Sequence, residues 1–248
     1  MKKISILLLT FTLFANVGCN AQFGDLLNKG RKIITGGSSG DASKLTNSEI
    51  IAGLKEALEV GSNNAGKQLS TINGYFGNQV IKILMPPEVK KVENTLRSIG
   101  MGAEVDKAIL AMNRAAEDAA AKAAPIFINA IKTMSIQDGL GILKGGNGAA
   151  TNYLKSRTTQ QLTNAFRPVI ENSLNKVNAT KYWSQVFTIY NRLPTTFNKV
   201  NPDLVGHVTE KALAGLFVTV EQEENKIRQN PSARVSDILR KVFGTSGL

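Results

Sequence analysis

Apolar residues recur at helical spacing along most of the chain that follows residue 45. Thr46 and Glu49 form the pattern of a capping box, and Ile50 and Leu54 follow at the spacing of one helix face. This pattern predicts a helix from Thr46 to about Leu69. Similar patterns predict helices over 88–99, 103–124, 126–134, 135–145, two stretches within 149–177, 178–193, 203–230 and 232–243.

Residues 70–87 interrupt this periodicity. Turn-forming Asn, Gly and Pro residues surround the short apolar run 80–85, so we expect an irregular excursion or a short β-hairpin here. Strict two-residue alternation is nowhere long enough to build a substantial sheet. The sequence therefore predicts an all-α fold, a single compact multi-helix bundle over residues 46–244.

Two details of the helical pattern carry specific expectations. Pro125 should kink or break the chain between the alanine-rich helix 103–124 and the helix after it. Segment 178–193 carries Tyr182 on one side and Trp183 on the other, so apolar groups lie nearly all round it. A helix with that pattern is expected to be buried.

The first residues have the layout of a secretory signal peptide. Lys2 and Lys3 precede an apolar stretch over residues 4–14, which is short for a membrane-spanning helix. Val17-Gly18-Cys19 resembles the end of a bacterial lipobox, in which the cysteine is lipidated and becomes the new N-terminus. This predicts a signal of residues 1–18 and a lipid anchor on Cys19.

A competing cleavage site remains open. Cys19-Asn20-Ala21 resembles an A-x-A signal cleaved before Gln22, and it would make the signal peptide residues 1–21. In either case residues 19–45 are rich in Gly and Ser and are expected to form a flexible tether. We therefore expect an exported protein, either periplasmic or a membrane-anchored lipoprotein of a Gram-negative-type envelope.

The composition excludes several kinds of chemical site. The 248 residues carry a formal net charge of +11, and two of the positive charges belong to the predicted signal. One Cys and one His exclude a disulfide framework and Cys- or His-rich metal sites, so we expect neither a metal nor a cofactor. The lone His207 is expected on a solvated helix surface.

The positive charge is concentrated in residues 151–200, where Glu171 is the only acid. This segment predicts a surface for an anionic envelope polymer or lipid, or simply a solvated one, while export disfavours nucleic acid. The basic residues are Lys155, Arg157, Arg167, Lys176, Lys181, Arg192 and Lys199.

Several sequence patches, taken together, resemble an uncharacterised bacterial family, domain of unknown function 4197. The resemblance covers about residues 48–244. It implies an exported, helical, envelope-associated protein and no established reaction. The patches are Gly74-Tyr75-Phe76, Leu84-Met85-Pro86, residues 112–117, 148–153, 212–217 and 223–228, and Pro231.

Polar residues within the predicted helices form the candidate sites. They can be structural ion pairs on solvated or packed faces, or they can converge in a pocket that binds a small ligand or performs catalysis. A sharper hypothesis pairs Arg114 with Glu224 or Glu221 across the core. The candidates are Asn113, Arg114, Glu117, Thr151, Tyr153, Glu221, Glu224 and Arg228.

The absence of a recognisable catalytic set favours a non-enzymatic function. We expect a lipid-anchored helical protein that binds an envelope component or a protein partner. The first alternative is an enzyme or small-ligand binder that uses a pocket formed by Arg114, Glu117, Glu224 and Arg228. The second is a carrier whose apolar cavity is lined by residues such as Phe127, Phe166 and Phe217.

Overall fold

A computed structural model describes residues 46–192, 199, 203–234, 236, 237, 240 and 242. The chain divides into two units, Met1–Lys44 and Leu45–Leu248, and the fold below is that of the second. The predicted signal peptide, Cys19 and the tether lie outside the described residues. The helices are α2 (Asn47–Leu69), η1 (Pro87–Val89), α3 (Lys90–Ser98), α4 (Gly102–Ala120), α5 (Ala123–Lys132), α6 (Ile136–Lys144), α7 (Ala149–Lys176), α8 (Ala179–Tyr190), α9 (Leu204–Gln229) and η2 (Pro231–Ala233).

The predicted all-α fold is confirmed, because the described residues contain helices, turns and irregular backbone but no strand. Residues 70–86 form the irregular excursion, and the β-hairpin alternative is wrong. The backbone of Ile83 exchanges hydrogen bonds with the side-chain amide of Asn113 on α4. A side chain thus takes the place that a partner strand would occupy in a hairpin.

Two helices begin where the sequence predicts. Thr46 Oγ1 accepts a hydrogen bond from the backbone N–H of Glu49 at 3.2 Å, and the Glu49 carboxylate accepts one from the backbone N–H of Thr46. Ser135 and Asp138 form the same reciprocal pair at the start of α6. Each box satisfies backbone donors that the first helical turn leaves without a partner.

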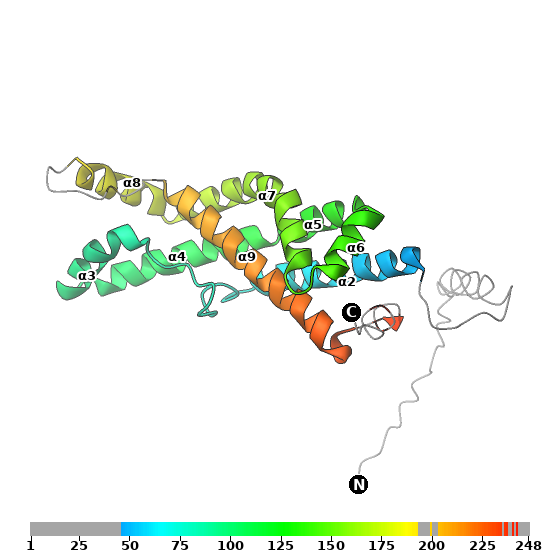
Figure 1. Ribbon diagram of the computed structural model, residues 1–248. Helices are drawn as coiled ribbons and strands as arrows, with labels where there is room; N and C mark the ends of the chain where they lie inside the picture. Colours follow the sequence, from blue (N-terminus) through cyan, green and yellow to red (C-terminus); the bar gives the residue numbers. More distant parts are fainter. Residues whose placement is uncertain are drawn as a thin grey trace, which may run out of the picture. The chain divides into compact units, whose positions relative to one another are not determined.

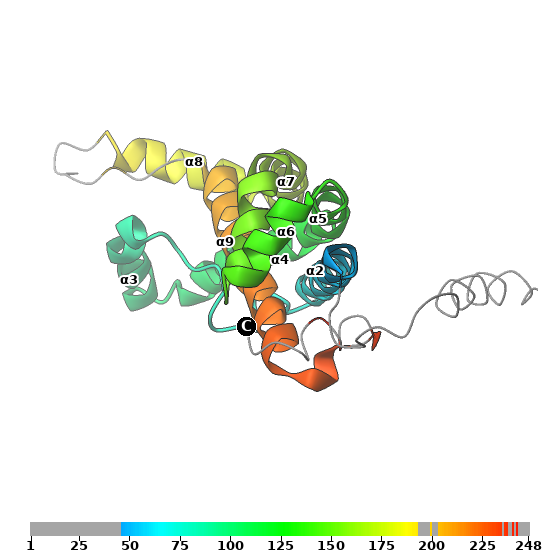
Figure 2. The same cartoon turned by 45° about the vertical axis from the view of Figure 1, so that its right-hand side comes forward.

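Helix α7 is the centre of the bundle. It packs most extensively against α9 and α4, and α2 packs against α5 and α9. Figure 1 shows α9 running obliquely across the other long helices, and Figure 2 shows the same crossing after a turn of the view. The core is therefore shared by all four long helices rather than divided into two halves.

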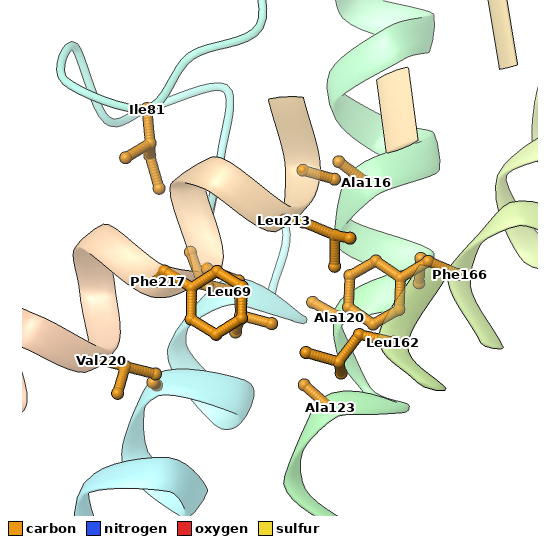
Figure 3. Packing of buried hydrophobic residues seen from close by; sticks show 14 of the residues in the cluster. Leu69, Ile81, Ala116, Ala120, Ala123, Leu162, Phe166, Leu213, Phe217 and Val220 are labelled. Atoms are coloured by element: carbon orange, nitrogen blue, oxygen red, sulfur yellow. The ribbon is translucent and has the colours of Figure 1, made fainter. Parts of the chain in front are cut away.

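Small residues let α4 approach its neighbours closely. Ala115, Ala116, Ala119 and Ala120 are each fully buried. Figure 3 shows Ala116 and Ala120 facing the larger side chains of α7 and α9, including Phe166. The alanine-rich sequence of α4 therefore serves both helix propensity and close packing.

The interval 149–177 differs from its prediction, since it forms one continuous helix rather than two stretches. Pro168 lies inside α7 and is exposed to solvent. A proline removes one helical hydrogen bond, and on the outer face of a helix the freed carbonyl can be hydrated. By contrast, Pro125 lies in the first turn of α5, so the predicted break before it is confirmed.

Helix α8 is less buried than its sequence suggests. Trp183 is 7% exposed, but Tyr182 is 62% exposed. The expectation of burial on all sides is therefore wrong at Tyr182. The side chains of 185–187, 189 and 190 lie outside the described residues, as does much of the predicted closing helix 232–243.

Candidate functional site

The first predicted polar cluster secures the irregular excursion to α4. Glu117 is 3% exposed, and its Oε1 accepts hydrogen bonds from the backbone N–H groups of Tyr75 and Phe76, each at 3.1 Å. Its Oε2 accepts a hydrogen bond from Arg114, which also donates to Asn73. The Glu117 carboxylate thus accepts three hydrogen bonds from groups of the protein itself.

Asn113 and Tyr75 complete this attachment. Asn113 is fully buried, and its amide donates to the carbonyls of Ile83 and Ile109 at 2.8 and 2.7 Å. The buried hydroxyl of Tyr75 donates to the carbonyl of Ala212 on α9 at 2.7 Å. Burial, together with the Glu117 carboxylate, raises the pKa of Tyr75 far above its usual range. The tyrosine therefore remains a neutral hydrogen-bond donor.

The second cluster caps a helix from outside. Helix α7 begins after Gly148, whose φ is 77° and which has no side chain to cap it. Glu224 of α9 instead accepts from the backbone N–H groups of Ala150 and Thr151 at 3.1 and 2.9 Å, and from the Thr151 hydroxyl at 2.8 Å. A carboxylate at this position also interacts favourably with the helix dipole.

Arg228 holds the capping carboxylate from the other side. Its Nε donates to Glu224 at 2.9 Å, as the i,i+4 spacing predicts, and its Nη2 donates to the carbonyl of Ile142 at 3.0 Å. The Arg228 side chain is 13% exposed. Glu224 and Arg228 therefore connect α6, α7 and α9.

The two clusters form two separate arrangements. Ala212, which bonds to Tyr75, and Glu224 are twelve residues apart on α9, which corresponds to about 18 Å along the helix. Arg114 bonds to Glu117 and Asn73, so the expected pairing of Arg114 with Glu224 or Glu221 across the core is wrong. The alternative of one convergent polar pocket is corrected as well, because the two clusters lie far apart along α9.

The remaining predicted residues take no part in the hydrogen bonds of the two polar clusters described above. The ring of Tyr153 faces Arg157 at 5.6 Å, and burial raises the pKa of its hydroxyl. Glu221 is exposed and lies beside Gly148 at the start of α7. His207 is half-buried rather than solvated, with its Nε2 3.3 Å from the carbonyl oxygen of Leu84, and burial lowers its pKa.

The three phenylalanines proposed to line a cavity are packed in the core. Phe127 and Phe166 are fully buried and Phe217 is 6% exposed. The Phe127 and Phe217 rings meet edge to face with their centroids 6.0 Å apart. Figure 3 shows Phe166 and Phe217 surrounded by other core side chains. The expected position of the cavity is therefore wrong.

A large apolar groove lies elsewhere, between α3, α4 and α8. Helices α3 and α8 project at one end of the helical unit (Figures 1 and 2). The cavity volume of the groove is about 900 Å³. Helices α3, α4 and α8, the last turns of α7 and the first residue of α9 contribute side chains. The apolar lining includes Val92, Leu96, Met101, Val105, Leu110, Met112, Ala115, Val177, Tyr182 and Trp183.

Large apolar side chains are left open to solvent along this groove. Met101 is 45% exposed, Leu110 36%, Val177 57% and Tyr182 62%. Exposed apolar groups gathered at one place on a protein typically mark a site of binding. The sequence could have indicated the groove through the apolar surface of 178–193, which we interpreted as core.

Most charged groups at the groove are engaged with other protein groups. Glu93 accepts hydrogen bonds from Lys90 and Arg97, which lower the pKa of its carboxyl despite the opposing effect of burial. Lys107 pairs with Glu104, and Arg114 with Glu117. Asp118 accepts a hydrogen bond from Ser173. These interactions leave the middle of the groove apolar.

No group of three or more His, Cys, Asp or Glu side chains suited to a metal ion occurs in the described part of the chain. Within the same residues, no helix has the length and apolar character needed to cross a membrane.

Comparison with known proteins gives one match. The family model described as "Protein of unknown function (DUF4197)" matches residues 44–244. The chain therefore belongs to this family, as its sequence patches predict. No curated protein and no solved structure matches the chain.

Proposed function

We propose that the protein is an exported, lipid-anchored lipoprotein whose helical domain binds the hydrocarbon chain of an envelope component. The observation that carries the proposal is the groove of about 900 Å³ between α3, α4 and α8. Binding of an envelope component was the leading sequence-based hypothesis, and the groove adds the apolar-ligand character of the second alternative.

The size and lining of the groove suit such a chain. Pockets that bind small molecules typically measure about 300–1,000 Å³ and are mostly apolar. Each methylene group removed from water contributes about 0.8 kcal/mol to binding. Met85, Met101 and Met112 all line the groove, and flexible thioether side chains adapt to ligands of different shape.

The polar clusters support a binding function over an enzymatic one. Glu117 accepts three hydrogen bonds and Glu224 accepts four, all from groups of the protein itself. A carboxylate that acts as a general base must be able to reach a proton of the substrate. Both carboxylates are instead occupied in holding the fold together.

The groove contains a fluorescent side chain that can report on binding. Trp183 is the only tryptophan in the chain, and it lines the groove. We expect dibromostearate to quench Trp183 fluorescence at low concentration, because bromine quenches an indole ring only at close range. The protein used is the full chain with Cys19→Ala, so that no attached acyl group competes.

Two alanine-to-phenylalanine substitutions, one inside the groove and one outside it, test where the probe binds. Ala111 lines the groove, so Ala111→Phe should fill it and weaken the apparent affinity about tenfold, the equivalent of roughly two buried methylene groups. Ala103→Phe on the exposed start of the same helix is the control and should have no effect. Val177→Asp changes an exposed lining residue and should also weaken binding without unfolding the protein.

Two results would overturn the proposal. One is that dibromostearate does not quench Trp183 at all. The other is that Ala111→Phe and Val177→Asp bind as well as Ala103→Phe does, which would mean that quenching arises outside the groove.

A further inference from the structure

Two polar groups at the groove differ from the others. Lys176 lies in the last turn of α7, and Tyr182 lies on α8 just beyond the corner that joins the two helices. Both side chains line the groove and both are exposed. Within the described part of the chain, neither the Lys176 ammonium nor the Tyr182 hydroxyl has an ion-pair or hydrogen-bond partner.

This pair is unusual because the neighbouring charges are already engaged. Lys107 and Arg114 each pair with a carboxylate. Asp118 also lines the groove, and it accepts a hydrogen bond from Ser173, which lies three residues before Lys176. Among the residues that the structure describes, Lys176 forms no ion pair, so it supplies an unneutralised positive charge at an apolar groove.

We infer that the groove binds a long-chain carboxylate, with the carboxylate group at Lys176 and Tyr182 and the hydrocarbon chain along the apolar wall. This inference rests on the proposed function and specifies its ligand. One ammonium and one hydroxyl supply a donor for each of the two carboxylate oxygens. A phosphate monoester carries a charge of about −1.5 to −2 at pH 7, more than the single ammonium of Lys176 neutralises.

Competition with dibromostearate distinguishes the contribution of the headgroup to binding from that of the hydrocarbon chain. Dodecanoate and dodecanol have equal chain lengths and differ at the headgroup, so we expect dodecanoate to displace the probe at lower concentration. Lys176→Gln should weaken dodecanoate binding about fivefold, which corresponds to the upper range for an exposed ion pair. Tyr182→Phe should weaken it about threefold through the loss of one hydrogen bond.

Controls distinguish charge from packing. Neither variant should change the binding of dodecanol, and Lys176→Arg should retain the affinity for dodecanoate. Lys122→Gln, on an exposed lysine outside the groove, should have no effect. Asp118→Asn removes a negative charge from the groove wall, so it should strengthen dodecanoate binding and leave dodecanol binding unchanged.

The outcomes separate this inference from the proposed function. If dodecanoate and dodecanol compete equally and Lys176→Gln changes neither, the headgroup assignment is wrong while the groove remains an apolar binding site. If dodecyl phosphate binds more tightly than dodecanoate, the ligand is a phosphate-bearing lipid and the carboxylate assignment is overturned. If no amphiphile displaces the probe and dibromostearate does not quench Trp183, the proposed function itself fails.

Discussion

At the scale of single residues, the buried carboxylates act as substitutes for missing secondary structure. Glu117 binds two backbone N–H groups of an irregular segment, and Glu224 binds two at the open start of α7. Backbone donors buried without partners cost about 1–3 kcal/mol each. The carboxylates remove that cost at places where neither a strand nor a local cap is available.

Glu224→Gln should show this directly. The substitution removes the charge that Arg228 faces and turns an amide NH₂ toward groups that are themselves donors. We expect the free energy of unfolding to fall by about 3 kcal/mol, as for other broken buried ion pairs. Urea denaturation followed by circular dichroism measures the change.

Glu221→Gln is the matched control. Glu221 lies three residues earlier on α9 and is exposed beside Gly148. Its contribution should stay below about 1 kcal/mol, the range of an exposed charge near a helix terminus. Equal losses in both variants would contradict a capping role for Glu224.

At the scale of elements, α7 shows a proline retained within a helix of 28 residues. Pro168 removes the hydrogen bond to the carbonyl of Asn164, and both residues are exposed. We expect Pro168→Ala to raise the free energy of unfolding by about 2 kcal/mol, since helix propensity improves by about 3 kcal/mol and the variant unfolded chain gains entropy worth about 1 kcal/mol. Thermal unfolding measures this. An unchanged or lowered stability would mean that the packing of α7 requires the bend that proline imposes.

The sequence predicts best those elements whose interacting residues lie close together along the chain. Thr46 with Glu49, and Ser135 with Asp138, are local signals, because the interacting residues lie three positions apart. The sequence predicts two stretches within 149–177. The continuity of α7 through Pro168 depends on which face of the helix meets solvent, and that is decided by packing against α4 and α9. Turn-forming residues predict that segment 70–86 is irregular. They do not predict its partners on α4, which lie 30 to 42 residues away along the chain.

The candidate site depended even more on long-range packing. The i,i+4 pair of Glu224 and Arg228 was visible in the sequence, whereas the capping of Thr151 by Glu224 spans 73 residues. The groove was missed because an apolar side chain has the same sequence pattern whether it is covered by protein or left open for a ligand. Tyr182 and Trp183 illustrate this, since they are neighbours with very different exposure.

At the scale of the whole molecule, the proposal combines two separate features, a lipid anchor on Cys19 and an apolar groove in the helical domain. Under the proposed function, a lipid attached to Cys19 would keep the helical domain at a membrane, which is also the source of the hydrocarbon chains that the groove is proposed to bind. A hydrocarbon chain that leaves the bilayer would therefore meet the groove without diffusing far through water.

The anchor can be tested independently of the groove. In cells supplied with an alkyne-tagged fatty acid, we expect the wild-type chain to carry the tag and to sediment with membranes. Cys19→Ala should lose the tag and leave the membrane fraction, because the thiol that receives the lipid is gone. A single acyl chain gives only marginal membrane binding, so stable sedimentation also implies more than one chain. The alternative signal makes a different prediction: an untagged wild-type protein whose first residue is Gln22, identified by the mass of its N-terminal peptide, would rule out the anchor.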